Sequence, residues 1–305
     1  MGLSFRVRDA EADDLGELIT LQRAAFLAEA HIYGHPRLPP MQETVEEARQ
    51  VLADAAFRVY VAEIDQPRPR IVGSVRAKPA GPITEVGRLA TVPDLLGRGI
   101  GGSLLQHVHD QPAPTTEEFE LYTGARSTGN HRLYAAHGYL PLRTFIDSEG
   151  VEVIIMRRPV LVNAPDRPRP RVCVYVTDND SLLVFGHRDL PTGVQAPAGG
   201  IAPGESVRAA AEREVFEKSG LAVRFTRLLG YADSQDPQTG ATRRTAYVTA
   251  TLLQDRPSGS WAHAVDSRDG DTGQVFVCRF APLRQNDLVE DQRAFLSVVT
   301  PQNSN

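Results

Sequence analysis

Hydrophobic residues alternate with polar ones in several short stretches of the chain, and in other stretches they recur at helical spacing. Alternation predicts strands, and spacings of three and four residues predict helices. In the first half we expect strands at 4–10, 58–64, 70–78, 85–92, 118–124 and 151–158, and helices at 13–30, 43–55, 99–109 and 130–138. In the second half we expect strands at 171–178, 181–188, 221–231, 242–253 and 273–283, and a helix at 205–219. This mixture of elements predicts the α/β (α+β) class. We expect the strands at 171–178 and 181–188 to form a hairpin that turns at Asn179 and Asp180.

A stretch rich in proline and arginine interrupts the pattern near the middle of the chain. Residues 159–171 hold four prolines and three arginines and lose hydrophobic periodicity after Val162. Such a composition favours an extended, solvated connection. We therefore predict two domains, at 1–158 and 171–305, joined by a linker at 159–170, a division that a length of 305 residues allows.

Composition and charge exclude several classes of function. The net charge of -5 and the lack of a basic face argue against nucleic-acid binding. No window approaches the roughly 18 consecutive apolar residues that a membrane span needs, and the N-terminus carries no apolar signal core. Cys173 and Cys278 lie in separate apolar runs, which predicts buried thiols rather than a disulfide or a zinc site. We expect a cytoplasmic protein without membrane or nucleic-acid partners, and the oligomeric state stays open.

A glycine-rich turn follows the strand expected at 85–92. Gly97, Gly99, Gly101 and Gly102 stand between that strand and the helix expected at 99–109. Backbone amides at a helix N-terminus can bind an anion where glycines leave them uncovered. A dinucleotide-binding fold would place its glycines near the start of the chain, with an acidic residue about 20 residues later, so the mid-domain position of this turn argues against that fold.

The order of this strand, the turn LLGRGIGGSLL, the strand ELYTG and the helix NHRLYAAHGY resembles the GNAT acetyltransferase family over about residues 4–158. The resemblance implies a GNAT acyltransferase fold that uses acetyl-CoA. It implies a strand that pairs with the pantetheine arm and a turn that binds the pyrophosphate. The strand residues are Leu89, Ala90 and Thr91, and the turn residues are Arg98, Gly99, Ile100, Gly101 and Gly102. Leu96 stands where the family pattern has a polar residue. This departure weakens the resemblance only slightly, because in the family the phosphates are held mainly by main-chain N–H groups, and Arg98 can supply a side-chain charge.

The same resemblance makes Tyr134 the general acid that returns a proton to the CoA thiolate, a task that suits a phenol of pKa about 10. Asn130 lies one helical turn before it and is expected to contact CoA, whereas many family members carry an asparagine where this chain has Ser127. For the base that takes the amine proton, Glu85 and Glu120 are the strand carboxylates nearest the expected cleft. A water relay would make a dedicated base unnecessary.

The amine acceptor is expected to bind at the long loop between the first two helices. This loop offers His31, Tyr33, His35 and Arg37, a mix of aromatic and basic groups that suits a small polar amine. Loops of this kind are where specificity usually varies. A plain surface loop is an equally acceptable interpretation, and the sequence does not identify the acceptor.

The segment GGIAPGESVRAAAEREVFEKSGL, at 199–221, resembles the Nudix box G-x5-E-x7-R-E-U-x-E-E-x-G-U. Eight of its nine defined positions match, namely Gly199, Glu205, Arg213, Glu214, Val215, Glu217, Gly220 and Leu221. The resemblance implies a Nudix α/β/α sandwich over about 171–300, with Arg213 orienting the carboxylates. Glu214 and Glu217 lie three residues apart on one helical face, where their oxygens can converge on Mg²⁺ bridging a diphosphate.

The ninth position is Lys218, one of two lysines in a chain with 31 arginines, where the family has a metal-binding glutamate. An ammonium has no lone pair and cannot be a metal ligand. The substitution changes the charge of the carboxylate cluster from -3 to -1, and the spacing from Glu214 suits an ion pair. Either diphosphate hydrolysis is impaired, or Lys218 points away and Glu214 and Glu217 hold Mg²⁺ with a later acid, which would be Asp266, Asp269 or Asp271. Without cleavage, the arginines of ATRRTAYV, together with Trp261 and His263, could still bind a nucleotide-like ligand.

Three functions fit these patterns. The first is an N-acetyltransferase that moves acetyl from acetyl-CoA to a small amine, with a Nudix-like domain of doubtful hydrolytic activity. The second makes the Nudix domain the catalyst, acting on a nucleoside diphosphate derivative, with a CoA-binding GNAT domain as its regulator. The third is a non-catalytic sensor made of two ligand-binding modules.

Overall fold

The structure, a computed structural model, describes residues 3–65, 68–188, 193–236, 239–265, 273–283 and 287–299. The chain divides into two compact units, Met1–Val160 and Leu161–Asn305. The division falls inside the proline-rich stretch at 159–170. Within the described ranges, none of the helices is both long enough and apolar enough to cross a membrane.

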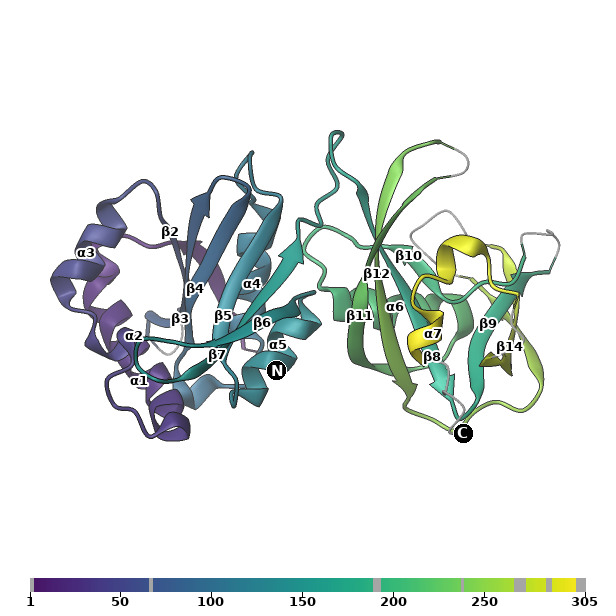
Figure 1. The fold of residues 1–305 in the computed structure, drawn as a ribbon, viewed down its shortest axis with the longest axis horizontal. Coiled ribbons are helices and arrows are strands. Elements are labelled where there is room, and N and C mark those ends of the chain that lie inside the picture. Colours follow the sequence, from purple (N-terminus) through teal and green to yellow (C-terminus); the bar gives the residue numbers. More distant parts are fainter. Residues whose placement is uncertain are drawn as a thin grey trace. The chain divides into compact units, whose positions relative to one another are not determined.

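The first unit contains a seven-stranded sheet in the order β1-β2-β3-β4-β5-β7-β6 (Figure 1). Its strands are β1 (Arg6–Asp9), β2 (Arg58–Ile64), β3 (Arg70–Ala80), β4 (Ile83–Thr91), β5 (Glu118–Gly124), β6 (Leu140–Ile146) and β7 (Glu152–Pro159). Neighbouring strands are antiparallel, except that β4 and β5 are parallel. The sequence pattern missed β6 because this edge strand is exposed along almost its whole length and shows no apolar alternation.

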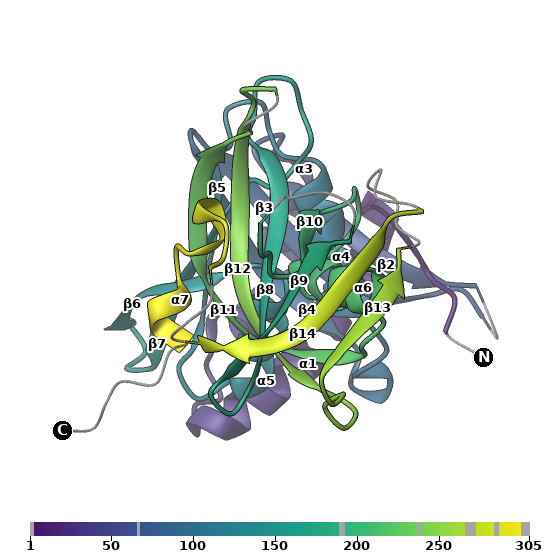
Figure 2. The same cartoon turned by 90° about the vertical axis from the view of Figure 1, so that its right-hand side faces the viewer.

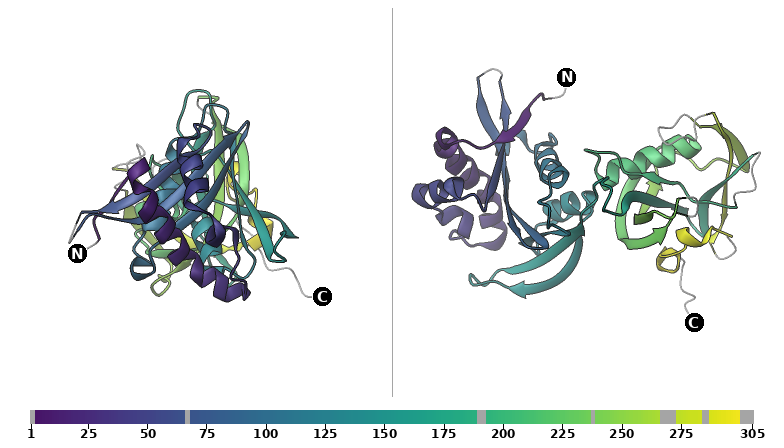
Figure 3. Two further views of the ribbon diagram at one scale, coloured as in Figure 1. Left: turned by 90° about the vertical axis from the view of Figure 1, so that its left-hand side faces the viewer. Right: turned by 90° about the horizontal axis from the view of Figure 1, so that it is seen from above.

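Helices cover both faces of this sheet. They are α1 (Leu15–Tyr33), α2 (Pro39–Gln42), α3 (Val45–Ala53), α4 (Ile100–Asp110) and α5 (Thr128–Ala136). The first three lie on one side of the sheet, and α4 and α5 lie on the other (Figure 3). Thr44 caps α3, because its hydroxyl accepts the N–H of Glu47 while the Glu47 carboxylate accepts the N–H of Thr44. Gly34 caps the end of α1 in the left-handed region with φ 63°, and the last helical residue, Tyr33, lies three residues beyond the predicted end at 30.

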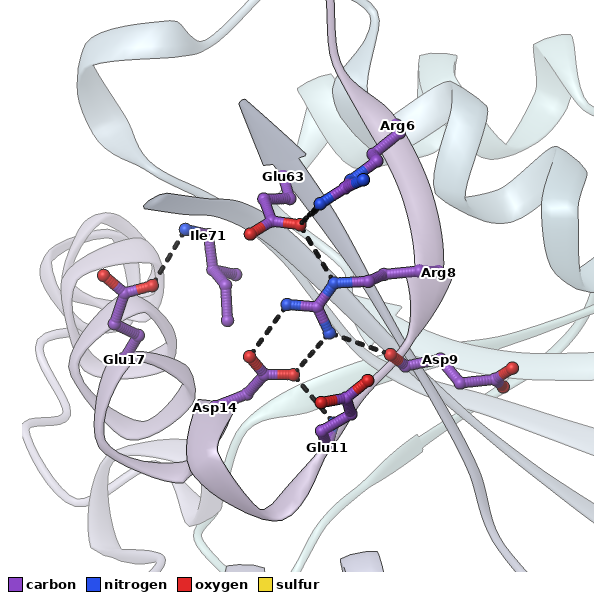
Figure 4. A network of polar contacts seen from close by, with 8 residues as sticks. All are labelled: Arg6, Arg8, Asp9, Glu11, Asp14, Glu17, Glu63 and Ile71. Atoms are coloured by element: carbon purple, nitrogen blue, oxygen red, sulfur yellow. Dashed lines mark hydrogen bonds and ion pairs between the residues drawn. The ribbon is translucent and has the colours of Figure 1, made fainter. Parts of the chain in front are cut away.

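An arginine network fixes the start of the chain against the sheet (Figure 4). Arg8 of β1 donates to Glu63 of β2 at 3.0 Å and to both oxygens of Asp14 at 2.7 and 2.9 Å. The hydrogen bonds from Arg8 hold the pKa of the Asp14 carboxyl below its usual range, despite the opposing effect of burial. In the next turn, the Glu17 carboxylate accepts the N–H of Ile71 at 2.9 Å. These contacts tie β1 and the first turns of α1 to β2 and β3.

The second unit contains strands in the order β11-β12-β8-β9-β14-β13, with β10 paired to β8 (Figure 2). They are β8 (Arg169–Asp178), β9 (Ser181–His187), β10 (Ala198–Gly200), β11 (Val223–Gln235), β12 (Thr242–Leu252), β13 (Ser260–Ala264) and β14 (Val275–Pro282). The predicted hairpin is confirmed, since Asp178 pairs with Ser181 and Asn179 turns the chain with φ 51°. Strands β8 and β12 are parallel. The pattern missed β10 and β13, which span only three and five residues.

Two helices flank these strands, as the predicted α/β/α arrangement requires (Figure 3). They are α6 (Val207–Ser219) and α7 (Leu296–Val299). The Ser206 hydroxyl accepts the N–H of Ala209 and caps α6, and Gly220 ends it in the left-handed region with φ 73°, directly after the predicted helix end at 219. On the other side, Leu296 and its neighbours pack on a core cluster that contains Tyr175 and Tyr247. This C-terminal helix has only four residues, about one turn, which is too short to show a helical period in the sequence.

Candidate functional site

The glycine turn between β4 and α4 is open to solvent. Gly97 and Gly99 adopt left-handed conformations with φ 74° and 84°, and a Cβ added to either would meet no atom within 4 Å. Arg98 between them is exposed, and the Leu96 side chain is 65% exposed. The first N–H groups of α4, those of Ile100, Gly101 and Gly102, have no partner within the helix. The turn therefore offers backbone donors without a partner in the helix, together with one exposed cationic side chain, which fits a pyrophosphate.

The strand predicted to pair with pantetheine lies directly beside this turn. A Cβ on Gly101 would lie 3.6 Å from the Thr91 Oγ1 and 4.0 Å from the Leu89 Cδ2. Ala90 points to the opposite face, into a cluster with Leu21 of α1. The structure thus brings the two predicted parts of the acetyl-CoA site together.

Strands β4 and β5 separate next to this region. Their parallel pairing covers only Ile83 to Glu85, which face Glu118 to Glu120. Arg88 forms a bulge in β4 with φ 52°, and the register with β3 shifts at the same place. Beyond Glu85, the side of β4 that faces β5 pairs with no described strand. An extended arm can add to such a strand edge through main-chain hydrogen bonds, which fits the prediction for residues 89–91.

Tyr134 lies on α5, next to the turn. The preceding residue, Leu133, approaches the position of a Gly101 Cβ to 3.6 Å. The Tyr134 side chain is buried, and burial, assisted by the negative charge of Glu29, raises the pKa of its phenol. Its hydroxyl makes no hydrogen bond to another residue that the structure describes. A phenol that stays protonated at neutral pH can donate a proton but cannot act as the base.

Glu29 of α1 binds both Asn130, the predicted CoA contact, and Ser127, which stands where many family members carry an asparagine. Its carboxylate accepts from the Asn130 Nδ2 at 3.1 Å and from the Ser127 hydroxyl. The Ser127 hydroxyl also lies 3.2 Å from the Tyr33 hydroxyl, and the Tyr33 side chain covers the backbone of Gly124 at the end of β5. Sequence reasoning missed Glu29, because one carboxylate on a helix reads as an ordinary solvent-facing residue. Asn130 and Ser127 therefore tie the start of α5 to the first helix.

The two carboxylates considered as the base differ in their surroundings. Glu85 and Glu120 are opposite one another where β4 and β5 last pair. The Glu120 carboxylate accepts from the Arg157 Nε at 2.6 Å, which binds it to β7. Glu85 is exposed and makes no ion pair within the described ranges. Of the two, Glu85 is the more available to an amine.

The predicted acceptor residues do not form one group. Tyr33 contacts β5, whereas the His35 Nε2 lies 3.5 Å from Glu149 in the turn between β6 and β7. His31 and Arg37 are exposed. The only one of the four that lies beside the Tyr134 region is Tyr33, whose hydroxyl accepts the N–H of Arg126 at 2.7 Å.

In the second unit, Arg213 donates hydrogen bonds to the three carboxylates of the Nudix box. It donates to Glu205 at 2.8 Å, to Glu214 at 2.7 Å and to Glu217 at 3.0 Å. The Glu214 side chain is fully buried and lies over the backbone of Gly199, so that a Cβ there would come within 2.2 Å of its Oε1. This contact explains why the box begins with glycine. The four predicted polar residues therefore come together as one cluster.

Lys218 is buried in the same helix, with 2% of its surface exposed. Its Nζ lies 5.7 Å from the centroid of the Phe276 ring on β14, in a cation–π contact. Its backbone carbonyl accepts from the Cys278 Sγ at 3.4 Å. Lys218 also lines a cavity of about 530 Å³ that opens beside β8, β10 and β12.

The described residues of the box do not by themselves fit a divalent metal. Among the described residues, no group of three or more metal-binding side chains is placed to hold an ion. Glu214 and Glu217 both accept from Arg213, and an ammonium lines the cavity where the family has a third carboxylate. The candidate later ligands Asp266, Asp269 and Asp271 lie outside the described residues.

Trp261 and His263 hold the end of α6. The Trp261 Nε1 donates to the Ser219 carbonyl at 2.9 Å, and the His263 Nε2 lies 3.1 Å from the Glu217 carbonyl. His263 also covers Gly220. These contacts supply hydrogen-bond partners to carbonyls at the C-terminus of α6 that have none within the helix. Trp261 and His263 of β13 therefore have a structural role.

Comparison with known protein families identifies the family of both parts of the chain. Residues 55–141 match the family model of the acetyltransferase (GNAT) domain, and residues 167–299 match that of the NUDIX domain. The protein therefore contains a GNAT acetyltransferase domain followed by a NUDIX domain, as the motifs predicted.

Several solved N-acetyltransferases resemble the first unit. One is the PaiA N-acetyltransferase from Thermoplasma acidophilum in complex with coenzyme A, with 18% identity over 52% of this chain and 99% of that chain and a TM-score of 0.42. Another is a ribosomal-protein-alanine N-acetyltransferase from Brucella melitensis, with 18% identity over 50% of this chain and 99% of that one and a TM-score of 0.42. A GNAT-family acetyltransferase from Streptococcus pneumoniae matches at 16% identity over 52% and 99% of the two chains, also with a TM-score of 0.42.

Proposed function

We propose that the first domain transfers an acetyl group from acetyl-CoA to a small amine. The observation that carries this proposal is the opening between β4 and β5, with the glycine turn on one side and Tyr134 nearby. Bound acetyl-CoA supplies an activated thioester. The turn at 98–102 holds its pyrophosphate and residues 89–91 pair with its pantetheine arm.

The amine nitrogen forms a bond to the acetyl carbon, and the bond from that carbon to sulfur breaks. Tyr134 gives its proton to the departing thiolate, since burial keeps the phenol protonated. The proton lost by the amine passes to Glu85 or to water, which leaves an amide and free CoA thiol. The cytoplasm is the expected compartment for this reaction.

Titration calorimetry with acetyl-CoA tests the cofactor site. We expect the full chain to bind with a Kd of roughly 1 mM or tighter, in the range typical of enzyme substrates. Arg98→Glu places a negative charge beside the phosphates and should weaken binding at least tenfold, which is about 1.4 kcal/mol. Arg49→Glu, on α3 and on the other face of the sheet, is the control and should leave Kd unchanged.

Absence of heat with millimolar acetyl-CoA would refute the transferase. If binding is found, release of free thiol should be measured with a panel of small amines, because that assay reports activity and acceptor class together. A protein that binds acetyl-CoA but acetylates none of the amines would support the rival function, in which this domain regulates the other.

For the second domain we propose that hydrolysis of diphosphates with Mg²⁺ is impaired. The support is Lys218, which brings a positive charge to the cavity where a metal-binding carboxylate would stand. Release of phosphate or nucleotide from ADP-ribose and common nucleotides should be compared between the wild type and Lys218→Glu, with Mg²⁺. We expect turnover to rise in the variant, and equal turnover would refute the proposal.

A further inference from the structure

The cavity of the second unit is large enough for a substantial part of a small molecule. Its volume of about 530 Å³ lies within the range of roughly 300–1,000 Å³ found for ligand pockets. Its walls come from β8, from β10 and the residues that follow it, from α6 and from β12. These elements belong to one unit and are joined by strand pairing, since β8 pairs with both β10 and β12.

The charged residues on its walls are almost all basic. They are Arg169, Arg171, Arg213, Lys218 and Arg243, with Asp236 as the one acid among the described lining residues. This balance contrasts with the net charge of -5 for the chain. The three carboxylates of the box are not among the residues that line the cavity, and all three accept hydrogen bonds from Arg213. An anion that enters therefore meets cationic side chains first.

The cations differ in how far they are already paired. Arg243 forms an ion pair with Asp236, and the Arg171 Nη1 lies 3.7 Å from the Asp291 carboxylate. The Arg169 side chain is exposed and has no hydrogen-bond or ion-pair partner within the described ranges. Lys218 is the one buried cation of the set, and it comes from the helix that carries the Nudix box. The cavity thus has a buried lysine on one wall and an exposed guanidinium on another.

We propose that this cavity binds a diphosphate group directly, with Lys218 and Arg169 supplying the positive charge that a divalent metal supplies in a magnesium-dependent enzyme. A buried charge acts on an anion in a medium of low dielectric, where its attraction is much stronger than in water. Guanidinium groups add bidentate hydrogen bonds to phosphate oxygens. The inference rests on the proposed impairment of hydrolysis and gives the domain a binding role.

The test is titration calorimetry of the full chain in excess EDTA and, separately, in Mg²⁺. Inorganic pyrophosphate and ADP are the two probes, since the diphosphate may come from either a free anion or a nucleotide. We expect binding in EDTA that Mg²⁺ does not strengthen. Binding of both probes indicates that the diphosphate is sufficient, and binding of ADP alone indicates that the nucleoside is also recognised.

Three variants locate the binding site. Lys218→Gln removes the buried charge and should weaken metal-free binding at least tenfold, about 1.4 kcal/mol. Arg169→Ala should weaken it severalfold, and this exposed residue keeps the test decisive if the Lys218 variant fails to fold. Arg224→Ala is the matched control, because Arg224 is an exposed arginine of β11 that does not line the cavity.

Other results of these titrations would contradict the inference. Binding that needs Mg²⁺, binding unchanged in both Lys218→Gln and Arg169→Ala, or no binding of either probe would overturn the inference. Binding lost in Arg98→Glu but kept in Lys218→Gln would assign the anion to the first domain and would also overturn it. Metal-free binding together with hydrolysis in Mg²⁺ as fast as in Lys218→Glu would support the inference and refute the proposed impairment.

Discussion

At the scale of single residues, the chemistry depends on which protonation state a side chain is forced to keep. Tyr134 is buried beside Glu29, and both effects favour the neutral phenol. Lys218 shows how one substitution redefines a site, because it replaces a possible metal ligand with a cation inside the cavity. In both cases the residue type was visible in the sequence, whereas the burial that gives it its effect was not.

Tyr134→Phe tests the assigned acid. We expect kcat for acetyl transfer to fall by a factor on the order of 10²–10⁴, because the thiolate loses its proton donor. KM for acetyl-CoA should change little, since the turn and the strand that bind it are intact. Tyr60→Phe is the control, as Tyr60 is also a buried tyrosine but lies on β2, three positions away from β5 in the sheet. Equal kcat values in wild type and Tyr134→Phe would remove Tyr134 from the mechanism.

At the scale of elements, a buried histidine joins α4 to the sheet. The His109 Nε2 lies 3.0 Å from the Tyr139 hydroxyl, and the Nδ1 faces the Arg158 Nη1 of β7 at 2.5 Å. An arginine can only donate, so Nδ1 is the acceptor and the ring is neutral. Burial, with the charges of Arg158 and His137, holds the pKa of His109 well below its usual value.

This histidine predicts how the stability of the first unit depends on pH. The pKa is lower in the folded state than the value of about 6.5 in the unfolded state, so the unfolded state takes up the proton first as pH falls. The free energy of unfolding should therefore be largest above about pH 6.5 and should fall as pH drops toward about 5. His109→Gln should flatten this dependence, measured by thermal unfolding, whereas His31→Gln at an exposed position of α1 should not. An unchanged slope in His109→Gln would contradict this role.

At the scale of the whole molecule, the chain consists of two units that each have their own sheet and core. The core around Tyr175 and Leu182 belongs wholly to the second unit, and the cluster of Leu21, Val61 and Ile71 belongs to the first. Each unit is also large enough to fold as a domain. Ligands for one unit need not affect the stability of the other.

We therefore expect two transitions when the full chain is unfolded by heat in a scanning calorimeter. Acetyl-CoA should raise the Tm of one transition and pyrophosphate in EDTA should raise that of the other, because a ligand stabilises the unit that binds it. Arg98→Glu should remove the first shift and Lys218→Gln the second. One cooperative transition that both ligands shift together would show that the units unfold as one.

Much of this organisation was predictable from local patterns. The strands at 58–64 and 118–124 appear with the predicted bounds, because the first carries a short apolar run and the second alternates apolar and polar residues. The Nudix box placed Arg213 with its carboxylates, since the helical repeat brings residues of one face together. Edge strand β6 and the short helix α7 were missed, because neither carries a periodic apolar signal.

The sequence by itself determined the order of elements, the two glycine-bounded motifs and the identity of the group at position 218, because these depend on residue type and on spacing along one helix or turn. Only the tertiary structure decided that Glu29 holds Ser127 and Asn130, that β4 leaves β5 after Glu85, and that arginines from β8 and β12 share a cavity with Lys218. These contacts join segments far apart in the chain. Their geometry is set by sheet pairing and by the packing of helices on it, which no local pattern contains.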